Sequence, residues 1–248
     1  MTAAGADLAL AALHSGICAC TACPLHRTRT QAVPGAGPVR ARIMAVGEAP
    51  GESEDREGLP FVGAAGRLLT QLVEGIGLHR EDIYITNVLK CRPPQNRDPN
   101  PDEVAACAHF LDEQVELIRP DVILVLGRHA GARLLPGQPG ISRIHGKRIR
   151  VGERLYVPLF HPAAALYNGA MLSTLQEDME LVRGYLAEAD AERRLAAWRA
   201  ATGAAPEAAE PLGLGLGLAP SPAPFPRAAP VEADPAPAPS VEGQLSLF

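Results

Sequence analysis

The feature that most constrains this chain is an alternation of short apolar runs with segments of helical period. Residues 42–46, 83–88 and 122–126 are apolar or β-branched runs of strand length. Residues 68–76 carry apolar side chains at helical spacing, and residues 100–118 begin with the Asn-Pro-Asp-Glu pattern of a helix start. Because strands that alternate with helices form parallel sheets, we expect a mainly parallel sheet covered by helices on both faces.

The ends of this alternating region complete the expected fold. An Ala- and Leu-rich helix is predicted over residues 2–16, a hairpin joins 149–151 to 155–157, and a closing helix covers 175–186. Pro158 has no N–H to donate, so we expect the last strand to lie at an edge of the sheet. The predicted fold is a three-layer α/β/α domain around a mainly parallel four-stranded sheet.

Polar or turn-forming residues follow each predicted strand. They are Gly47–Gly51 after the first strand, Asn87 after the second, Gly127 after the third and His161 after the fourth. Because ligands of such sheets bind at the carboxyl ends of the strands, we expect these four segments to surround one site.

The last 48 residues differ in composition from the rest of the chain. They hold ten prolines, with one arginine against five acidic residues, whereas residues 1–200 carry 22 basic and 23 acidic side chains. A near-neutral body argues against a protein that coats DNA by charge alone. We predict a folded domain over 1–200, a disordered Pro/Ala/Gly-rich linker over 201–240 and a terminal peptide over 241–248.

The sequence contains neither a long uncharged apolar run nor a secretory signal pattern, so we expect a cytoplasmic protein. In that reducing setting a disulfide framework is not expected for five cysteines. Cys20 and Cys23 are three residues apart, and Cys91 and Cys107 lie far downstream. The two pairs could form one four-thiolate site for iron-sulfur or zinc, or Cys91 and Cys107 could be buried apolar residues. Cys18 is spare in each interpretation.

Four motifs together with the cysteine spacing carry a family resemblance. The motifs are G-E-A-P-G-x-x-E-D at 47–55, G-L-P-F-V-G-x-A-G-R-L-L at 58–69, I-T-N-V-L-K-C-R-P-P-x-N-R at 85–97 and F-H-P-A at 160–163. With Cys20, Cys23, Cys91 and Cys107, they resemble the family 4 uracil-DNA glycosylases over about residues 18–185. The resemblance implies a uracil-DNA glycosylase fold, base excision repair of uracil in DNA, and a [4Fe-4S] cluster on these four cysteines.

The resemblance also implies a pocket that receives a flipped uracil. Phe61 would stack on the ring, Asn87 would read its amide edge, and Glu48, Ala49, Pro50 and His161 would complete the uracil site. Hydrolysis passes through a cation-like sugar and a uracil anion. Glu48 would therefore activate water and favour the cation, while His161 would hydrogen-bond the anion. Glu54 would crowd the C5 carbon and exclude thymine.

Basic residues near these motifs suggest contacts to the DNA backbone. The residues expected to contact phosphates are Lys90, Arg92, Arg97, Arg143 and Lys147, with Arg148 beside them. The expected substrate is single- or double-stranded DNA that contains uracil. We expect a monomer that works at the bacterial nucleoid and has no membrane partner.

The last five residues, Gln244, Leu245, Ser246, Leu247 and Phe248, resemble the peptide by which bacterial proteins bind the DNA sliding clamp. A peptide at the end of a flexible linker is free to enter a groove on a partner. The resemblance therefore implies the sliding clamp as a second partner.

Two other interpretations remain open. A relative that captures uracil-DNA covalently through a histidine would share the fold and the cluster, and Arg143-Ile144-His145 resembles part of its motif at a different place in the chain. The chain could instead be an iron-sulfur or zinc module without hydrolytic activity. Turnover is preferred because residues 92–97 lack the insertion that marks covalent capture.

Overall fold

The fold is built on one five-stranded sheet, described here from a computed structural model that covers residues 2–152, 154–166 and 168–202. The strand order is β2-β1-β3-β5-β4. The strands are β1 (Ile43–Gly47), β2 (Ile83–Asn87), β3 (Val122–Leu126), β4 (Ile149–Val151) and β5 (Arg154–Leu159). Four of them are parallel, and β4 pairs antiparallel with β5. The predicted α/β class and its four parallel strands are confirmed, and β4 adds a fifth strand.

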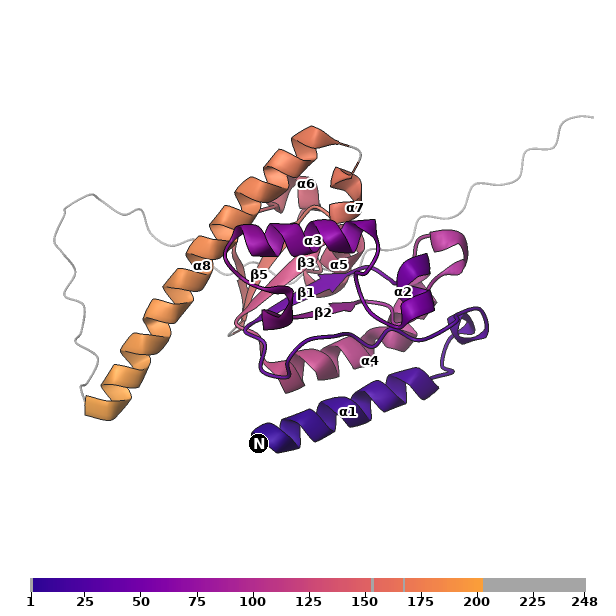
Figure 1. Ribbon diagram of the computed structural model, residues 1–248, viewed down its shortest axis with the longest axis horizontal. Helices are drawn as coiled ribbons and strands as arrows, with labels where there is room; N and C mark the ends of the chain where they lie inside the picture. The colour runs from indigo at the N-terminus through magenta and orange to yellow at the C-terminus, as the bar shows by residue number, and fades with distance from the viewer. Residues whose placement is uncertain (1, 153, 167, 203–248) are drawn as a thin grey trace, which may run out of the picture. The chain divides into compact units, whose positions relative to one another are not determined.

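Helices cover both faces of the sheet (Figure 1). On one face lie α3 (Ala64–Gly75), α7 (Pro162–Ala165) and α8 (Gly169–Thr202), which share one apolar cluster with the sheet. The opposite face is covered by α4 (Pro101–Ile118), α5 (Gly127–Leu134) and α6 (Ile141–Ile144), and α1 (Ala3–Ala19) packs outside α4. The strands between these layers are buried along their whole length, apart from β4 and the first residue of β5.

Short elements connect the layers at the ends of the strands. They are α2 (Glu52–Glu57) and the 3-10 helices Pro24–Arg27, Arg80–Asp82 and Pro94–Asn96. The helix α2 begins inside the acidic motif at 47–55, and the sequence analysis did not predict it.

Pro158 does not place its strand at the edge, so this prediction is wrong. The strand β5 lies between β3 and β4, but β4 pairs only with residues 154–156. Pro158 lies beyond that pairing, and its carbonyl accepts from the N–H of Gly146 instead. The missing N–H of proline therefore costs no ladder bond, because no strand faces it on that side.

Two helices run further than predicted. The first helix continues past Gly16 to Ala19, which brings its end to Cys20, and α8 extends well beyond residue 186. In the part of the chain that the structure describes, no helix is both long and apolar enough to cross a bilayer. The predicted linker over 201–240 lies outside the described residues except for 201 and 202, and the peptide 241–248 lies entirely outside them.

Candidate active site

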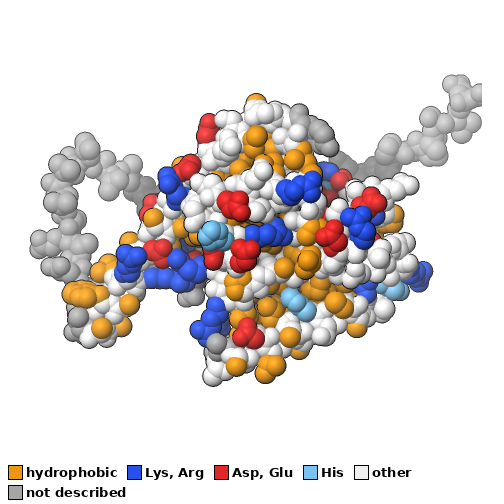
Figure 2. Space-filling model, in the orientation of Figure 1, with side chains coloured by type: hydrophobic (Ala, Val, Ile, Leu, Met, Phe, Trp, Pro, Cys, Tyr) orange, Lys and Arg blue, Asp and Glu red, His pale blue; other side chains and the backbone are white. Residues whose placement is uncertain are grey.

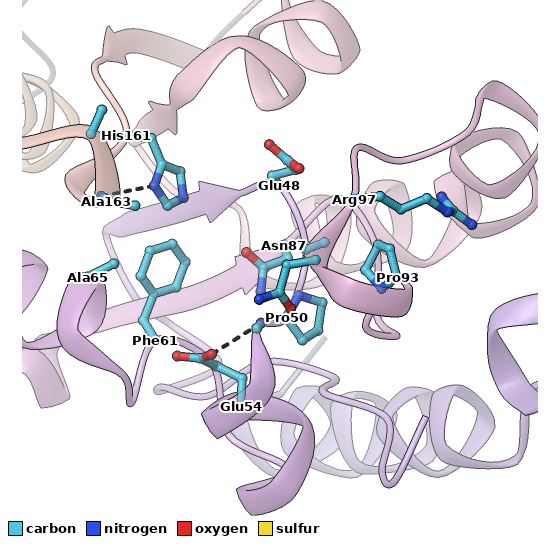
Figure 3. Close-up of a pocket in the computed structure, with 14 residues that line it drawn as sticks. Glu48, Pro50, Glu54, Phe61, Ala65, Asn87, Pro93, Arg97, His161 and Ala163 are labelled. Atoms are coloured by element: carbon cyan, nitrogen blue, oxygen red, sulfur yellow. Dashed lines mark hydrogen bonds between the residues drawn. The ribbon is translucent and has the colours of Figure 1, made fainter. Parts of the chain in front are cut away.

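A cavity of about 400 Å³ opens at the carboxyl ends of the parallel strands. The side chains drawn in Figure 3 come from chain segments far apart in the sequence and surround one common space. The cavity is lined by Glu48, Ala49, Pro50, Gly51, Glu54, Phe61, Ala65, Asn87, Pro93, Asn96, Arg97, His161, Ala163 and Ala164. The structure thus brings together all the residues that the sequence assigned to the uracil site.

Asn87 supplies the most specific polar group of the cavity. It is the last residue of β2, its side chain is buried, and its Oδ1 has no hydrogen-bond partner among the described residues. Gly47 ends the neighbouring strand, and a Cβ there would lie 2.4 Å from Asn87 Oδ1 and 2.6 Å from Cζ of Phe61. The amide and the ring therefore occupy space that only a glycine leaves open. An unsatisfied buried acceptor costs about 1–3 kcal/mol, so this oxygen is suited to a ligand with an N–H group.

Phe61 forms an aromatic wall of the cavity, and its backbone is strained. Its φ angle is 52°, in the left-handed region that non-glycine residues rarely adopt. The ring is buried, and a Cβ at Gly66 would lie 1.8 Å from the carbonyl oxygen of Phe61. Arg80 holds the preceding residue, because its Nη2 donates to the Pro60 carbonyl at 2.6 Å. The ring is thus fixed by contacts on both sides of the strained residue.

Glu54 holds the same loop through its carboxylate. Its Oε1 accepts from the N–H groups of Val62 and Gly63 at 2.9 and 2.8 Å, and its Oε2 accepts from Gly51 at 3.1 Å. One of these bonds is drawn in Figure 3. The side chain lines the cavity, but its oxygens are committed to backbone amides. Its predicted part in excluding thymine stays a prediction, while its part in positioning the Phe61 loop is visible.

His161 follows β5 and caps the short helix α7. Its Nδ1 accepts from the N–H of Ala163 at 3.2 Å (Figure 3). Burial lowers the pKa of His161 to about 4, with an opposing effect from Glu54, so the ring is neutral at pH 7. A neutral ring that accepts at Nδ1 carries its proton on Nε2, and this N–H is a donor for a ligand. The ring also stacks on Phe61, with centroids 5.7 Å apart.

Glu48 comes directly after β1 and lies beside two residues that the sequence analysis did not single out. His129 Nε2 on α5 is 3.7 Å from Glu48 Oε2 and 3.4 Å from Asp98 Oδ1. Burial raises the pKa of Glu48, and the nearby His129 opposes this effect. The position of His129, three residues after the end of β3, is the signal that could have identified it, because that strand end was already expected at the site.

The four cysteines expected to bind metal lie around a second, smaller cavity. Cys20, Cys23, Cys91 and Cys107 all line it, and Cys18 does not. Arg29 Nη1 lies 3.0 Å from Cys91 Sγ, as a cation that donates to a thiolate would. In the described part of the chain, no three of the four sulfurs lie within 4.8 Å of one another. Four thiols from two distant segments are the donor set that both structural zinc sites and iron-sulfur clusters use.

Lys90 does not lie at a DNA-binding surface, and its predicted contact with phosphate is wrong. Its side chain is 1% exposed. Its Nζ donates to Thr86 Oγ1, the Asn87 carbonyl and Gln114 Oε1, each at 2.7 Å. Burial lowers the pKa of Lys90 to about 7, and the nearby Cys107 opposes this effect. The lysine ties the cysteine loop to the backbone of Asn87 instead of meeting solvent.

The other predicted DNA-binding residues are accessible to different degrees. Arg97 lies on the cavity rim but forms a bidentate pair with Glu103, and Arg92 is half-buried and donates to Asn96. Arg143 and Lys147 are exposed. Basic and acidic side chains are interspersed on the face in Figure 2, without a single basic field. Arg148 is exposed but pairs with Glu188.

His145 does not belong to the cavity. Its Nδ1 lies 3.1 and 2.9 Å from the two oxygens of the buried Asp178, and its ring packs on Phe160 at 4.7 Å between centroids. It is not among the residues that line the pocket. An imidazole held in this way is poorly placed to attack a sugar bound beside Glu48, which argues against covalent capture through His145.

Comparison with known proteins agrees with this geometry. Residues 34–183 match the family model of the Uracil DNA glycosylase superfamily. A type-4 uracil-DNA glycosylase of Sulfurisphaera tokodaii is 47% identical over 176 residues, which cover 67% of this chain and 80% of the relative. One from Saccharolobus solfataricus is 49% identical over 173 residues, with 66% and 80% covered. A type-5 uracil-DNA glycosylase of Pyrobaculum aerophilum is 33% identical over 175 residues, with 63% and 76% covered.

Proposed function

This chain belongs to the uracil DNA glycosylase superfamily, on the branch of its type-4 members, and on this premise we propose that it excises uracil from DNA. The reaction is hydrolysis of the N-glycosidic bond, which leaves an abasic site and begins base excision repair. Because the target base lies inside the base stack of a duplex, a duplex substrate must extrude its nucleotide into the cavity.

The observation that carries this proposal is the unpaired, buried Oδ1 of Asn87. Uracil has an N–H donor at N3, whereas cytosine has an acceptor there. A uracil ring placed against Phe61 would satisfy Asn87, and cytosine would leave two acceptors facing each other. The mispairing costs about 1–3 kcal/mol per unsatisfied buried group, which favours uracil.

Glu48 and His161 then divide the chemistry. The bond between N1 of uracil and C1′ of deoxyribose breaks, and its electron pair leaves with the base. The Nε2–H of His161 donates to a uracil oxygen and stabilises the negative charge that develops there. The imidazole does this as a neutral group, because burial lowers its pKa. The ionised Glu48 favours the cation-like sugar, orients water toward C1′ and accepts its proton.

The four cysteines around the smaller cavity support a [4Fe-4S] cluster held by Cys20, Cys23, Cys91 and Cys107. When bound, the cluster would link the end of α1 to the segment from Lys90 to α4 through these four thiolates. The same segment carries Lys90, which bonds to the Asn87 carbonyl, and Pro93, which lines the uracil cavity. These contacts support a structural role for the cluster.

Contacts to DNA are proposed for the predicted basic residues whose side chains are at least partly exposed. They are Arg92, Arg97, Arg143 and Lys147. A guanidinium has five N–H donors, so Arg97 could contact a phosphate and keep its pair with the buried Glu103. Glu54 is proposed to exclude the methyl group of thymine through its side-chain carbons, because its oxygens are already bonded.

The terminal peptide Gln244–Phe248 is proposed to dock on the bacterial sliding clamp and to bring the enzyme, as a monomer at the nucleoid, to newly made DNA. Deletion of these five residues should abolish clamp binding in a pull-down and leave excision from a short oligonucleotide unchanged. Clamp binding that survives the deletion would contradict this part of the proposal.

The function itself is tested with the full-length, cluster-loaded protein and a duplex oligonucleotide that contains one uracil. Alkali cleaves the resulting abasic site, and the product is measured against oligonucleotides with cytosine or thymine at the same position. We expect cleavage of the uracil strand alone, at a rate about 100- to 1000-fold lower in Glu48→Ala. A protein that leaves the uracil strand intact would refute the proposal.

A further inference from the structure

Glu48 faces two groups that have no part in the reaction derived above. One ligand atom of each of Glu48, Asp98 and His129 lies within 4.8 Å of the other two. The three residues come from three elements: the turn after β1, the loop before α4 and the first turn of α5. The carboxylate of Glu48 is turned away from Asn87 and Phe61 in Figure 3.

The imidazole between the two carboxylates is incompletely bonded. Within the part of the chain that the structure describes, the buried His129 Nε2 makes no hydrogen bond of ordinary geometry, although it lies 3.4 Å from Asp98 and 3.7 Å from Glu48. Hydrogen bonds of this kind span about 2.7–2.9 Å, so a movement of about 1 Å by the Glu48 side chain would complete the contact. A buried nitrogen without a partner is costly, which favours that movement.

We propose that His129 is a positioning residue for Glu48, which binds one carboxylate oxygen and leaves the other to orient the attacking water. The inference rests on the proposed glycosylase function, because only that reaction gives Glu48 a water to orient. Oε2 of Glu48 faces His129, and no hydrogen bond to Oε1 occurs among the described residues. A carboxylate held at one oxygen loses rotational freedom before the substrate arrives, and this favours a reactive geometry.

The local fold places His129 at the site. The helix α5 begins at Gly127, immediately after β3, with φ 85°. A Cβ at Gly127 would lie 2.9 Å from Cβ of His161, so the glycine lets α5 start against the active site. The first turn of α5 therefore delivers His129 to one side of Glu48 while His161 approaches from β5.

Charged groups around Glu48 make the contact sensitive to pH. Burial raises the pKa of Glu48, His129 and Arg128 on α5 oppose this effect, and Asp98 adds to it. Arg128 Nη2 is itself 2.5 Å from Asp98 Oδ2. The other titratable groups of the cavity wall are Glu54, Arg97 and His161. Replacing His129 thus removes one of the groups that lower the pKa of Glu48 and keep its carboxylate ionised.

The test is the pH dependence of single-turnover excision by His129→Gln in the full-length, cluster-loaded protein. Glutamine retains an N–H donor of similar reach, but its side chain cannot bind a proton and become positively charged. We expect the acidic limb of the profile to move to higher pH, and the rate on that limb to be about tenfold lower for each pH unit of movement. The affinity for the DNA substrate should be unchanged. His79→Gln, an exposed histidine before β2, is the matched control and should match the wild type. Iron content and Tm verify folding.

A second variant changes the opposite charge. Asp98→Asn should move the acidic limb to lower pH, by less than His129→Gln moves it upward, because the Asp98 side chain is 60% exposed. A limb that stays in place or moves upward in Asp98→Asn contradicts the arrangement, as does an unshifted limb in His129→Gln. If the wild type is active and these limbs do not move as stated, this inference alone fails. An inactive wild type overturns the proposed function instead.

Discussion

The uracil cavity and the cysteine cavity are organised in different ways. In the first, hydrogen bonds within the protein hold the walls: Glu54 binds three backbone amides and Arg80 binds the Pro60 carbonyl. In the second, the ligand atoms are thiols among apolar neighbours, and burial raises the pKa of Cys107 to about 11. Hydrogen bonds within the chain hold the walls of the first cavity, whereas we propose that the second is held together by a cluster bound to its cysteines.

The comparison predicts that substitutions in the uracil cavity can abolish most of the excision activity while the protein keeps its cluster. Glu48→Ala and His161→Ala should each lower the single-turnover rate by about 100- to 1000-fold, because each removes charge stabilisation in the transition state. Iron and sulfide content and the visible absorption band should equal those of the wild type. Loss of iron in either variant would show that the two regions are not independent.

The converse change should affect stability more than chemistry. Cys91→Ala removes one predicted ligand, and we expect low iron content and a Tm lower by roughly 5–10 °C, from a loss of about 2–3 kcal/mol. Cys18→Ala is the matched control, because Cys18 does not line the cysteine cavity. Equal iron content in the two variants would remove Cys91 from the ligand set.

The claim that protein hydrogen bonds shape the uracil cavity is tested at Glu54. Glu54→Ala frees the N–H groups of Val62 and Gly63, so the strained backbone of Phe61 should relax. We expect kcat/KM for uracil to fall by about tenfold, equivalent to about 1.4 kcal/mol. Glu54→Gln keeps an acceptor for these amides and should lose less. Equal losses in both variants would mean that charge, and not loop position, is the contribution of Glu54.

The pH profile gives the smallest and most specific effect. Burial raises the pKa of Glu48, while that of His161 is lowered to about 4. The role proposed for Glu48 requires its ionised form, so activity should be lost as pH falls through its raised pKa, while His161 is still neutral. The wild type should show one acidic limb above the usual carboxyl range, measured by single-turnover rates from pH 4 to 8. The residual activity of Glu48→Ala should lack this limb.

Much of the site could be predicted because its residues occupy strand ends. An apolar run that is followed by a polar residue marks both a buried strand and the edge where it stops, and parallel strands share that edge. Glu48, Asn87 and His161 were expected together for this reason, and they line one cavity. Family motifs added the roles of Phe61 and the cysteines, which periodicity alone does not define.

The sequence by itself determined the order of strands and helices and the edge at which the polar side chains gather, because these follow from local periodicity and chain direction. Only the tertiary structure decided that Lys90 is buried, that β5 lies inside the sheet and that His129 faces Glu48. Each of these depends on which side chain arrives from a distant segment, as Gln114 does for Lys90. Periodicity describes neighbours along the chain, whereas burial and charge pairing depend on neighbours in space.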